Sequence, residues 1–289
     1  MKRFHLLSLI LMIFTFVLIA AGGLVTSTGS GLSVPDWPLS FGMLFPEMKG
    51  GVQYEHTHRV IAGVVLLLTI ALAWMARREV PRRLAVLAFA GVPLVLLQAL
   101  LGGMTVLLLL PLPVSVFHAC LGQSFFALTV SLWWLSAENR LVGADATPDL
   151  PITRLQRKLG HLTLGVLLLQ LFLGAYVRHS GGHAVLEHIG GAFVVTAFVA
   201  SLALISRAAY PDHPGVRAAS TLVLICLVLQ IALGYGSFLW TVLKPASAGR
   251  PLERILITAA HQTVGALILA FSTALFLAGP GRRDLKRVS

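Results

Sequence analysis

The stretch YEHTHRV, residues 54–60, places a carboxylate, two imidazoles and a guanidinium at the start of a long apolar run. Helix residues advance about 100° each, so Glu55 and His58 share a face, whereas His56 lies about 200° from His58. His58 is therefore the better candidate for a metal ligand, and Glu55 would lie beside whatever His58 binds. Glu55 and Arg59 are four apart, so an ion pair between them is the alternative interpretation.

Four of the ten histidines share a further property, because each lies at or near the same end of an even-numbered apolar segment. They are His58, His118, His188 and His261, two in each half of the chain. An imidazole near lipid is costly unless it has a partner or a use. Two facing histidines per half can supply both axial ligands of a haem iron. Zinc fits less well, since two histidines leave its tetrahedral site incomplete, and a proton relay stays open.

The second half of the chain lacks the spacing found around Glu55. Its carboxylate, Glu187, directly precedes His188 instead of standing three residues before it. We therefore expect the two halves to differ in task, with one holding a reacting molecule and the other a fixed cofactor.

The elements that would position these side chains are membrane helices. The 289 residues are 57% hydrophobic and 11% charged, whereas soluble domains carry roughly a quarter charged residues. Apolar runs long enough to span a bilayer fall near residues 6–26, 57–76, 84–109, 115–136, 159–177, 187–206, 218–242 and 255–278. Backbone groups in lipid must be hydrogen-bonded internally, so these runs predict an all-α bundle of eight transmembrane helices.

The basic residues predict the direction of the helices. If the N-terminus is cytoplasmic, the inner segments hold sixteen of the 22 lysines and arginines and the outer segments hold six. This positive-inside bias predicts cytoplasmic N- and C-termini and puts the four histidines toward the extracytoplasmic side. The +11 net charge is thus explained by topology; since no nucleic-acid motif is found, the expected partner is the lipid bilayer and not nucleic acid. No added targeting presequence precedes the first run, which favours a bacterial plasma membrane.

Internal repeats divide the chain into two tandem, pseudo-symmetric four-helix bundles. The segments LQALLG (97–102), LQLFLG (169–174) and LQIALG (229–234) share an LQxxLG pattern, and HACLG (118–122) matches HQTVG (261–265). We expect the small residues of these segments to serve helix packing. The predicted organisation is an N-terminal half at 1–137, a cytoplasmic linker at 138–158 and a C-terminal half at 159–289.

Several segments together resemble the haem A synthase family. They are GGLVTSTGSGLSVPDWPLSFG (22–42), EHTHR (55–59) as E-x-x-H-R, FHACLGQ (117–123), GAYVRHSGG (174–182) and AHQTVG (260–265). The E-x-x-H-R motif alone is weak, but with the glycine-rich outer loop, eight spans and four histidines it is specific. The resemblance extends over nearly the whole chain.

This resemblance implies a function for each half. The N-terminal half would hold the substrate, haem O, between His58 and His118, and the C-terminal half would hold haem B between His188 and His261. The reaction would oxidise the C8 methyl group of haem O to a formyl group, giving haem A for terminal oxidases. Glu55 matches the family's essential carboxylate.

The same resemblance suggests contacts and partners. Arg59 and Arg178 are expected to contact haem propionates, since guanidinium suits carboxylates. Haem O synthase is the expected source of the substrate, the electron acceptor is unknown, and an oligomer is compatible with the sequence.

The chain also departs from the family pattern. Val34 stands where a cysteine is often found, and Thr26 stands where relatives often have arginine. These departures put a thiol role and the expected propionate binding in doubt, and His183 is an alternative to His188. The competing function is a bis-histidine di-haem membrane cytochrome that only transfers electrons. A proton-coupled transporter fits less well, because it would place ionisable groups near the midplane.

Overall fold

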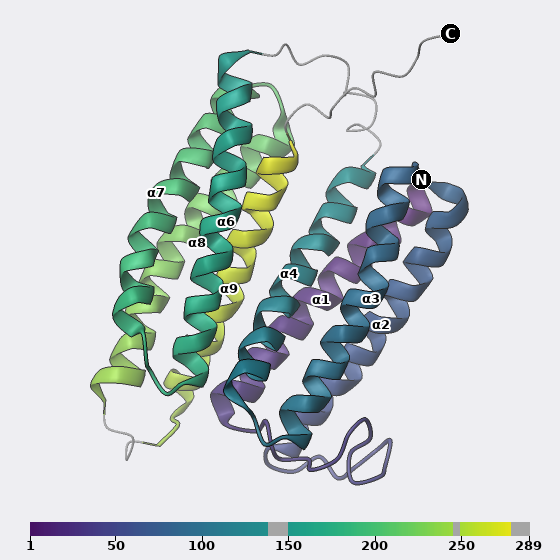
Figure 1. Cartoon of the computed structure of the whole chain (residues 1–289), viewed down its shortest axis with the longest axis vertical. Helices are drawn as coiled ribbons and strands as arrows, with labels where there is room; N and C mark the ends of the chain where they lie inside the picture. The colour runs from purple at the N-terminus through teal and green to yellow at the C-terminus, as the bar shows by residue number, and fades with distance from the viewer. Residues whose placement is uncertain (138–149, 245–248, 279–289) are drawn as a thin grey trace.

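The computed structural model describes residues 1–137, 150–244 and 249–278, and this part of the chain forms eight long helices (Figure 1). The helices are α1 (Lys2–Thr28), α2 (Val52–Glu79), α3 (Arg82–Leu107), α4 (Leu112–Ser136), α6 (Pro151–His179), α7 (Val185–Ala209), α8 (Pro214–Phe238) and α9 (Leu252–Leu277). A π-helical turn, η1 (Leu239–Leu243), extends α8. All eight helices are long and apolar enough to cross a membrane, so the predicted all-α membrane fold is confirmed.

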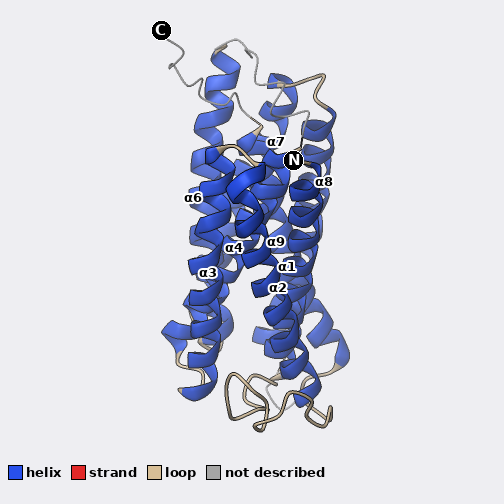
Figure 2. Cartoon of the chain, turned by 90° about the vertical axis from the view of Figure 1, so that its right-hand side faces the viewer, coloured by secondary structure: helices blue, strands red, loops and turns tan. Residues whose placement is uncertain are grey.

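Proline and glycine set several helix ends. Pro151 and Pro214 are the first residues of α6 and α8, where the missing N–H costs nothing. Gly29 ends α1 in a left-handed conformation, with φ 76°, which a glycine adopts without strain. These signals bring residues 30–51 out of the bundle as a long loop between α1 and α2 (Figure 2).

The helices form two groups of four that pack along their length (Figure 1). In the first group α1 packs on α2, α2 on α3, α3 on α4, and α4 on α1. The second group repeats this order with α6, α7, α8 and α9. Helices α2 and α4 therefore occupy one diagonal of the first group, and α7 and α9 occupy the matching diagonal of the second.

The two groups share an interface in which α9 packs against both α1 and α4. The approach of α1 to α9 is close at Gly23, where an added Cβ would lie 3.6 Å from the backbone of Ala259. One large apolar core contains Ile19, Phe126 and Trp134 of the first group together with residues of α6 to α9. The halves are thus packed as a single membrane body.

The position of the expected linker needs correction. Residues 138–149 lie outside the described part of the chain, but residues 151–158 are the first turns of α6 and not a linker. The basic residues of this segment interrupt the apolar run and hide the helix from a hydropathy criterion. Its other face is buried, and the fully buried Gln156 donates from Nε2 to the Leu275 carbonyl of α9 at 2.7 Å.

Candidate functional site

The carboxylate of Glu55 lies in the first turn of α2, at the end of the first group that carries the 30–51 loop. The residue is only 3% exposed. Its Oε2 accepts a hydrogen bond from the backbone N–H of Val34 at 2.9 Å, and its Oε1 accepts from Arg59. The ion pair expected from the four-residue spacing is therefore present. Since both oxygens have donors, the orientation of the carboxylate is fixed.

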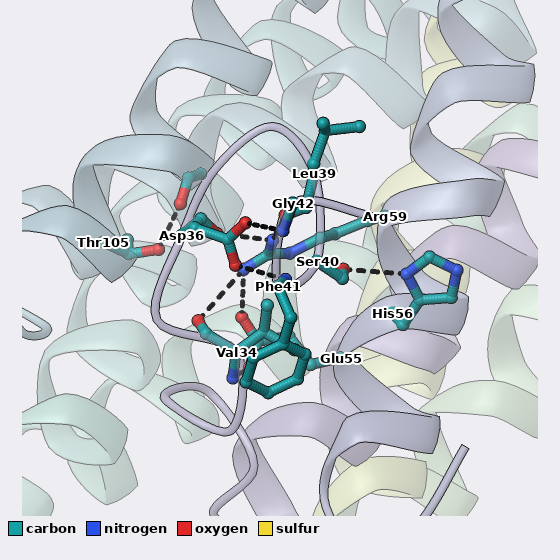
Figure 3. A network of polar contacts seen from close by, with 11 residues as sticks. Val34, Asp36, Leu39, Ser40, Phe41, Gly42, Glu55, His56, Arg59 and Thr105 are labelled. Atoms are coloured by element: carbon teal, nitrogen blue, oxygen red, sulfur yellow. Dashed lines mark hydrogen bonds and ion pairs between the residues drawn. The ribbon is translucent and has the colours of Figure 1, made fainter. Parts of the chain in front are cut away.

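Arg59 connects α2 to the 30–51 loop. Its guanidinium donates to the carbonyl oxygens of Asp36 at 2.6 Å and Val34 at 3.3 Å, and also to that of Leu39 (Figure 3). His56 points to the same loop, where its Nδ1 lies 2.8 Å from Ser40 Oγ. His56 thus points away from the face shared by Glu55 and His58, as helical geometry predicted.

Asp36 and Trp37 shape this loop. The Asp36 carboxylate accepts backbone N–H groups of Gly42 and Phe41, each at 2.7 Å. These two donors lower the pKa of Asp36 from its ordinary value of 3.8. Trp37 lies against α3 at Gly103, where an added Cβ would be 2.7 Å from the indole ring.

The four candidate histidines each lie against a glycine of the preceding helix. An added Cβ would approach the histidine Cε1 to 3.0 Å at Gly22 (His58), 3.1 Å at Gly102 (His118), 2.9 Å at Gly174 (His188) and 3.1 Å at Gly234 (His261). Contacts this short leave no room for a side chain opposite the imidazole. The glycines therefore form four equivalent seats, and the structure repeats one local arrangement four times.

The two histidines of the second half form a facing pair. Their ring centres are 6.2 Å apart and their planes are inclined at 83°. A metal–imidazole bond of about 2 Å on each side, plus about 1 Å from nitrogen to ring centre, spaces two axial rings roughly 6 Å apart. The separation of His188 and His261 therefore suits opposite ligands of one metal atom. His183 lies exposed before α7, and His188 is the residue that pairs with His261.

In the first half, His58 on α2 and His118 on α4 occupy the corresponding diagonal. The Nδ1 atoms of all four histidines are buried without a hydrogen-bond partner within the described residues. Pairs of imidazoles on facing helices are what a haem with two axial histidines would use. Over residues 1–137, 150–244 and 249–278, no cluster of three or more His, Cys, Asp or Glu could hold a metal alone. The donor set thus fits a haem better than a zinc ion.

Two glutamines of the LQxxLG segments join neighbouring helices at the candidate histidines, as the expected packing role allows. Gln98 donates from Nε2 to the carbonyl of His118 at 2.9 Å, and Gln170 donates to the carbonyl of His188 at 2.8 Å. The signal was the repeat itself, since each glutamine stands four residues before a glycine seat. Its meaning required knowing which helix lies opposite.

Arg178 links the two halves of the molecule. Its guanidinium donates to the Gly23 carbonyl at 3.0 Å, to Ser27 Oγ at 2.7 Å and to the Thr258 carbonyl at 3.1 Å. Ser27 Oγ also lies 2.8 Å from Thr258 Oγ1. The two arginines expected to contact propionates therefore both bind backbone carbonyls in this structure.

Three of the remaining histidines have other contacts. His5 Nδ1 lies 2.9 Å from Ser136 Oγ, His161 Nδ1 lies 2.8 Å from the Arg157 carbonyl, and His213 caps the start of α8. None of these contacts involves a glycine seat of the kind found at the four candidates.

Fold and site together define a multi-pass membrane protein whose two four-helix groups each carry a pair of imidazoles suited to a haem. The family model for the cytochrome oxidase assembly protein (COX15-CtaA) matches residues 5–56 and 53–188. The chain belongs to this family, and the resemblance found in the sequence motifs is confirmed.

Individual bacterial relatives agree with this assignment. A heme A synthase of Bacillus pumilus is 32% identical over 180 residues, which are 61% of this chain and 59% of the relative. One from Alkalihalophilus pseudofirmus is 30% identical over 183 residues, 62% of this chain and 61% of the relative. A heme A synthase of Staphylococcus haemolyticus is 26% identical over 260 residues, with 81% and 84% covered. The match thus spans about three fifths of the first two relatives.

Replacing a glycine seat should disturb the histidine opposite it. In Gly174→Ala the new Cβ would lie 2.9 Å from His188 Cε1, so the ring must move. We expect a loss of at least half of the haem bound by the second half, measured as the haem-to-protein ratio and the absorption spectrum. Gly165→Ala on the same helix is the control, because a Cβ there meets nothing within 4 Å. Equal haem content in both variants would contradict the seat assignment.

Removing the Asp36 carboxylate should loosen the loop. We expect the amides of Phe41 and Gly42 to exchange hydrogen about three- to tenfold faster in Asp36→Ala at pH 7, measured by mass spectrometry. Because the pKa of Asp36 is lowered by folding, its contribution is present above pH 3.8 and is lost as the pH falls through the folded value. Glu47→Ala is the control, since Glu47 pairs with Lys49 at the surface. Unchanged exchange in Asp36→Ala would show that the carboxylate does not hold the loop.

Proposed function

We propose that this protein is a haem A synthase, which oxidises the C8 methyl group of haem O to a formyl group through an alcohol. The N-terminal half binds the substrate haem O between His58 and His118. The C-terminal half binds haem B between His188 and His261. The observation that carries the proposal is an asymmetry between two matching pairs of histidines. Among the residues that the structure describes, only the first pair has a buried carboxylate within one helical turn of a histidine, Glu55 before His58.

The carboxylates of the two halves differ in burial as well as in spacing. Glu55 is buried and oriented by two donors, whereas Glu187 is exposed at the start of α7. A fixed carboxylate beside a ligand can accept a proton from a reacting carbon or stabilise positive charge that develops there. An electron-transfer cytochrome does not need such a group. The burial of Glu55 therefore favours the enzyme over the di-haem electron carrier.

The second half would carry electrons away from the substrate site. Haem B, when bound, supplies one-electron redox chemistry at its iron. The protein's contribution there is to hold two imidazoles at a fixed separation, through the glycine seats and the Gln170 contact. The immediate acceptor of these electrons is outside the chain, and haem O synthase is the proposed source of the substrate.

We further propose that the protein lies in a bacterial plasma membrane with both termini cytoplasmic. The histidine seats share the end of the bundle that carries the 30–51 loop. Arg77, Arg78, Arg82 and Arg83 mark the opposite end, at the turn between α2 and α3. The positive-inside rule makes that end cytoplasmic. Both haem sites then face the extracytoplasmic side, and the propionate contacts of Arg59 and Arg178 remain proposals for the loaded protein.

Removing the carboxylate should separate binding from chemistry. In Glu55→Ala we expect haem A formation to fall by at least about 100-fold, the scale of a lost acid–base or electrostatic contribution. Bound haem should persist, because both axial histidines remain. The measurement is extraction and identification of the pigment. Glu187→Ala is the matched control and should keep normal activity; normal haem A formation in Glu55→Ala would refute the role of Glu55.

Removing a ligand of the second half should cost haem B alone. In His261→Ala we expect loss of the haem B absorption with the substrate haem retained in the first half. His183→Ala is the control, since His183 is exposed and unpaired with His261. A normal haem B spectrum in His261→Ala would show that the ligand assignment is wrong.

A further inference from the structure

The four histidine seats are not held in the same way. In three of them, a glutamine four residues before the seat glycine reaches the histidine's helix. Gln98 and Gln170 donate to the carbonyls of His118 and His188, and Gln230 Nε2 lies 3.5 Å from His261 Nε2. Gln98 and Gln170 therefore tie the backbone of a ligand-bearing helix to its neighbour, whereas Gln230 contacts the imidazole of His261 itself.

Each of these glutamines has a glycine beneath it on the histidine's helix. An added Cβ at Gly122 would lie 2.9 Å from Gln98 Nε2, and one at Gly265 would lie 3.2 Å from Gln230 Nε2. An added Cβ at Gly191, three residues after His188, would instead clash with Gln170 Oε1. The amide and its glycine form one device, because the amide reaches the other helix only where that helix lacks a side chain. We call this pair the amide clamp.

The amide clamp is missing at His58, where both of its parts are replaced. Leu18 stands four residues before Gly22, and neither Ile61 nor Ala62, three and four residues after His58, is a glycine. Leu18 packs into the apolar core of the first group, and its side chain has no N–H to donate. His58 is thus the one ligand of the four whose helix is not tied by a glutamine.

The outer turn of α2 is instead attached to the loop. Arg59, directly after His58, donates to carbonyls of Val34, Asp36 and Leu39 and pairs with Glu55 (Figure 3). Leu39 is itself exposed. Contacts that a helix makes with a loop open more easily than contacts between two packed helices, because loops are more mobile than the elements they connect. The position of His58 therefore depends on the loop.

We propose that His58 is the releasable ligand of the protein and that the 30–51 loop, through Arg59, controls its release. This inference rests on the proposed function, in which the first half must take up a substrate haem and let the product go. The second half has both ligands next to a glutamine and retains its haem. The first site has Leu18 and Ala62 in place of a glutamine and a glycine. This difference in sequence is what makes its haem exchangeable in our proposal.

The test is the rate at which haem leaves each half of the full-length holoprotein. The protein, loaded with haem B in both sites, is mixed with excess apomyoglobin and the transfer is followed by absorbance. We expect a fast phase from the first half and a slow phase from the second. The His261→Ala variant assigns the phases, because it should lack the slow one. A single common rate in the wild-type protein would overturn the proposal.

Installing the clamp should slow only the first site. In Leu18→Gln combined with Ala62→Gly, the fast phase should slow about five- to tenfold, the effect of one net hydrogen bond. The matched reverse change, Gln170→Leu with Gly191→Ala, should speed only the slow phase by a similar factor. An installed clamp that leaves the fast phase unchanged, in a protein with normal haem content and circular dichroism, would overturn the proposal.

A variant of the loop provides a second test, which does not require the clamp variant to fold. Asp36→Ala should speed the fast phase severalfold and leave the slow phase unchanged, and combining it with the installed clamp should abolish the effect. An unchanged fast phase in Asp36→Ala would overturn the role of the loop. These rates are measured without turnover. A protein that makes haem A but releases both haems equally would therefore retain the proposed function and lose only this inference.

Discussion

The exclusion of any side chain opposite each imidazole is the constraint on which the site depends. Four histidine rings lie so close to the preceding helix that only glycine fits there, at Gly22, Gly102, Gly174 and Gly234. Each seat fixes which pair of helices must be neighbours and at what depth they touch. Two seats per group leave the histidines on one diagonal and the glycines on the other. The histidines of each group thus lie on the two helices between which a haem with two axial ligands would be held.

Polar contacts at the loop end make the two halves different without changing this frame. In the first half, Glu55 and Arg59 join α2 to the loop, whereas in the second half Arg178 joins α6 to α1 and α9. The first network lies between a helix and a loop, and the second lies among helices. A site built beside the first network can be rearranged by loop motion, while the environment of the second is fixed by packing. The proposed division of labour between substrate and cofactor would follow from this difference.

Much of the fold and part of the site were predictable from the sequence. The apolar runs predicted eight helices because lipid leaves the backbone no alternative, and the i to i+4 spacing predicted the pair of Glu55 and Arg59. The predicted start of this helix, near residue 159, was too late, because α6 begins at Pro151. Basic residues on one face of its first turns interrupt the apolar run, although the other face buries Gln156. The glycine seats and the loop contacts of Asp36 were not predicted. The seats depend on which helix packs against each glycine, and the Asp36 contacts depend on the positions of backbone N–H groups. The types of the residues alone predict neither.

The LQxxLG pattern is most informative about function at the one helix of the four that departs from it. LQxxLG occurs three times with glutamine, and the fourth helix in register has Leu18 at that position with Gly22 retained. The retained glycine shows that the seat for the ring is still needed there, since its clearance from His58 matches the other three. Only the attachment between helices differs, since position 18 is a leucine and neither Ile61 nor Ala62 is a glycine. The absence of both parts, in the half that also has the buried carboxylate, fits the proposed site, which must position a ligand and still release it.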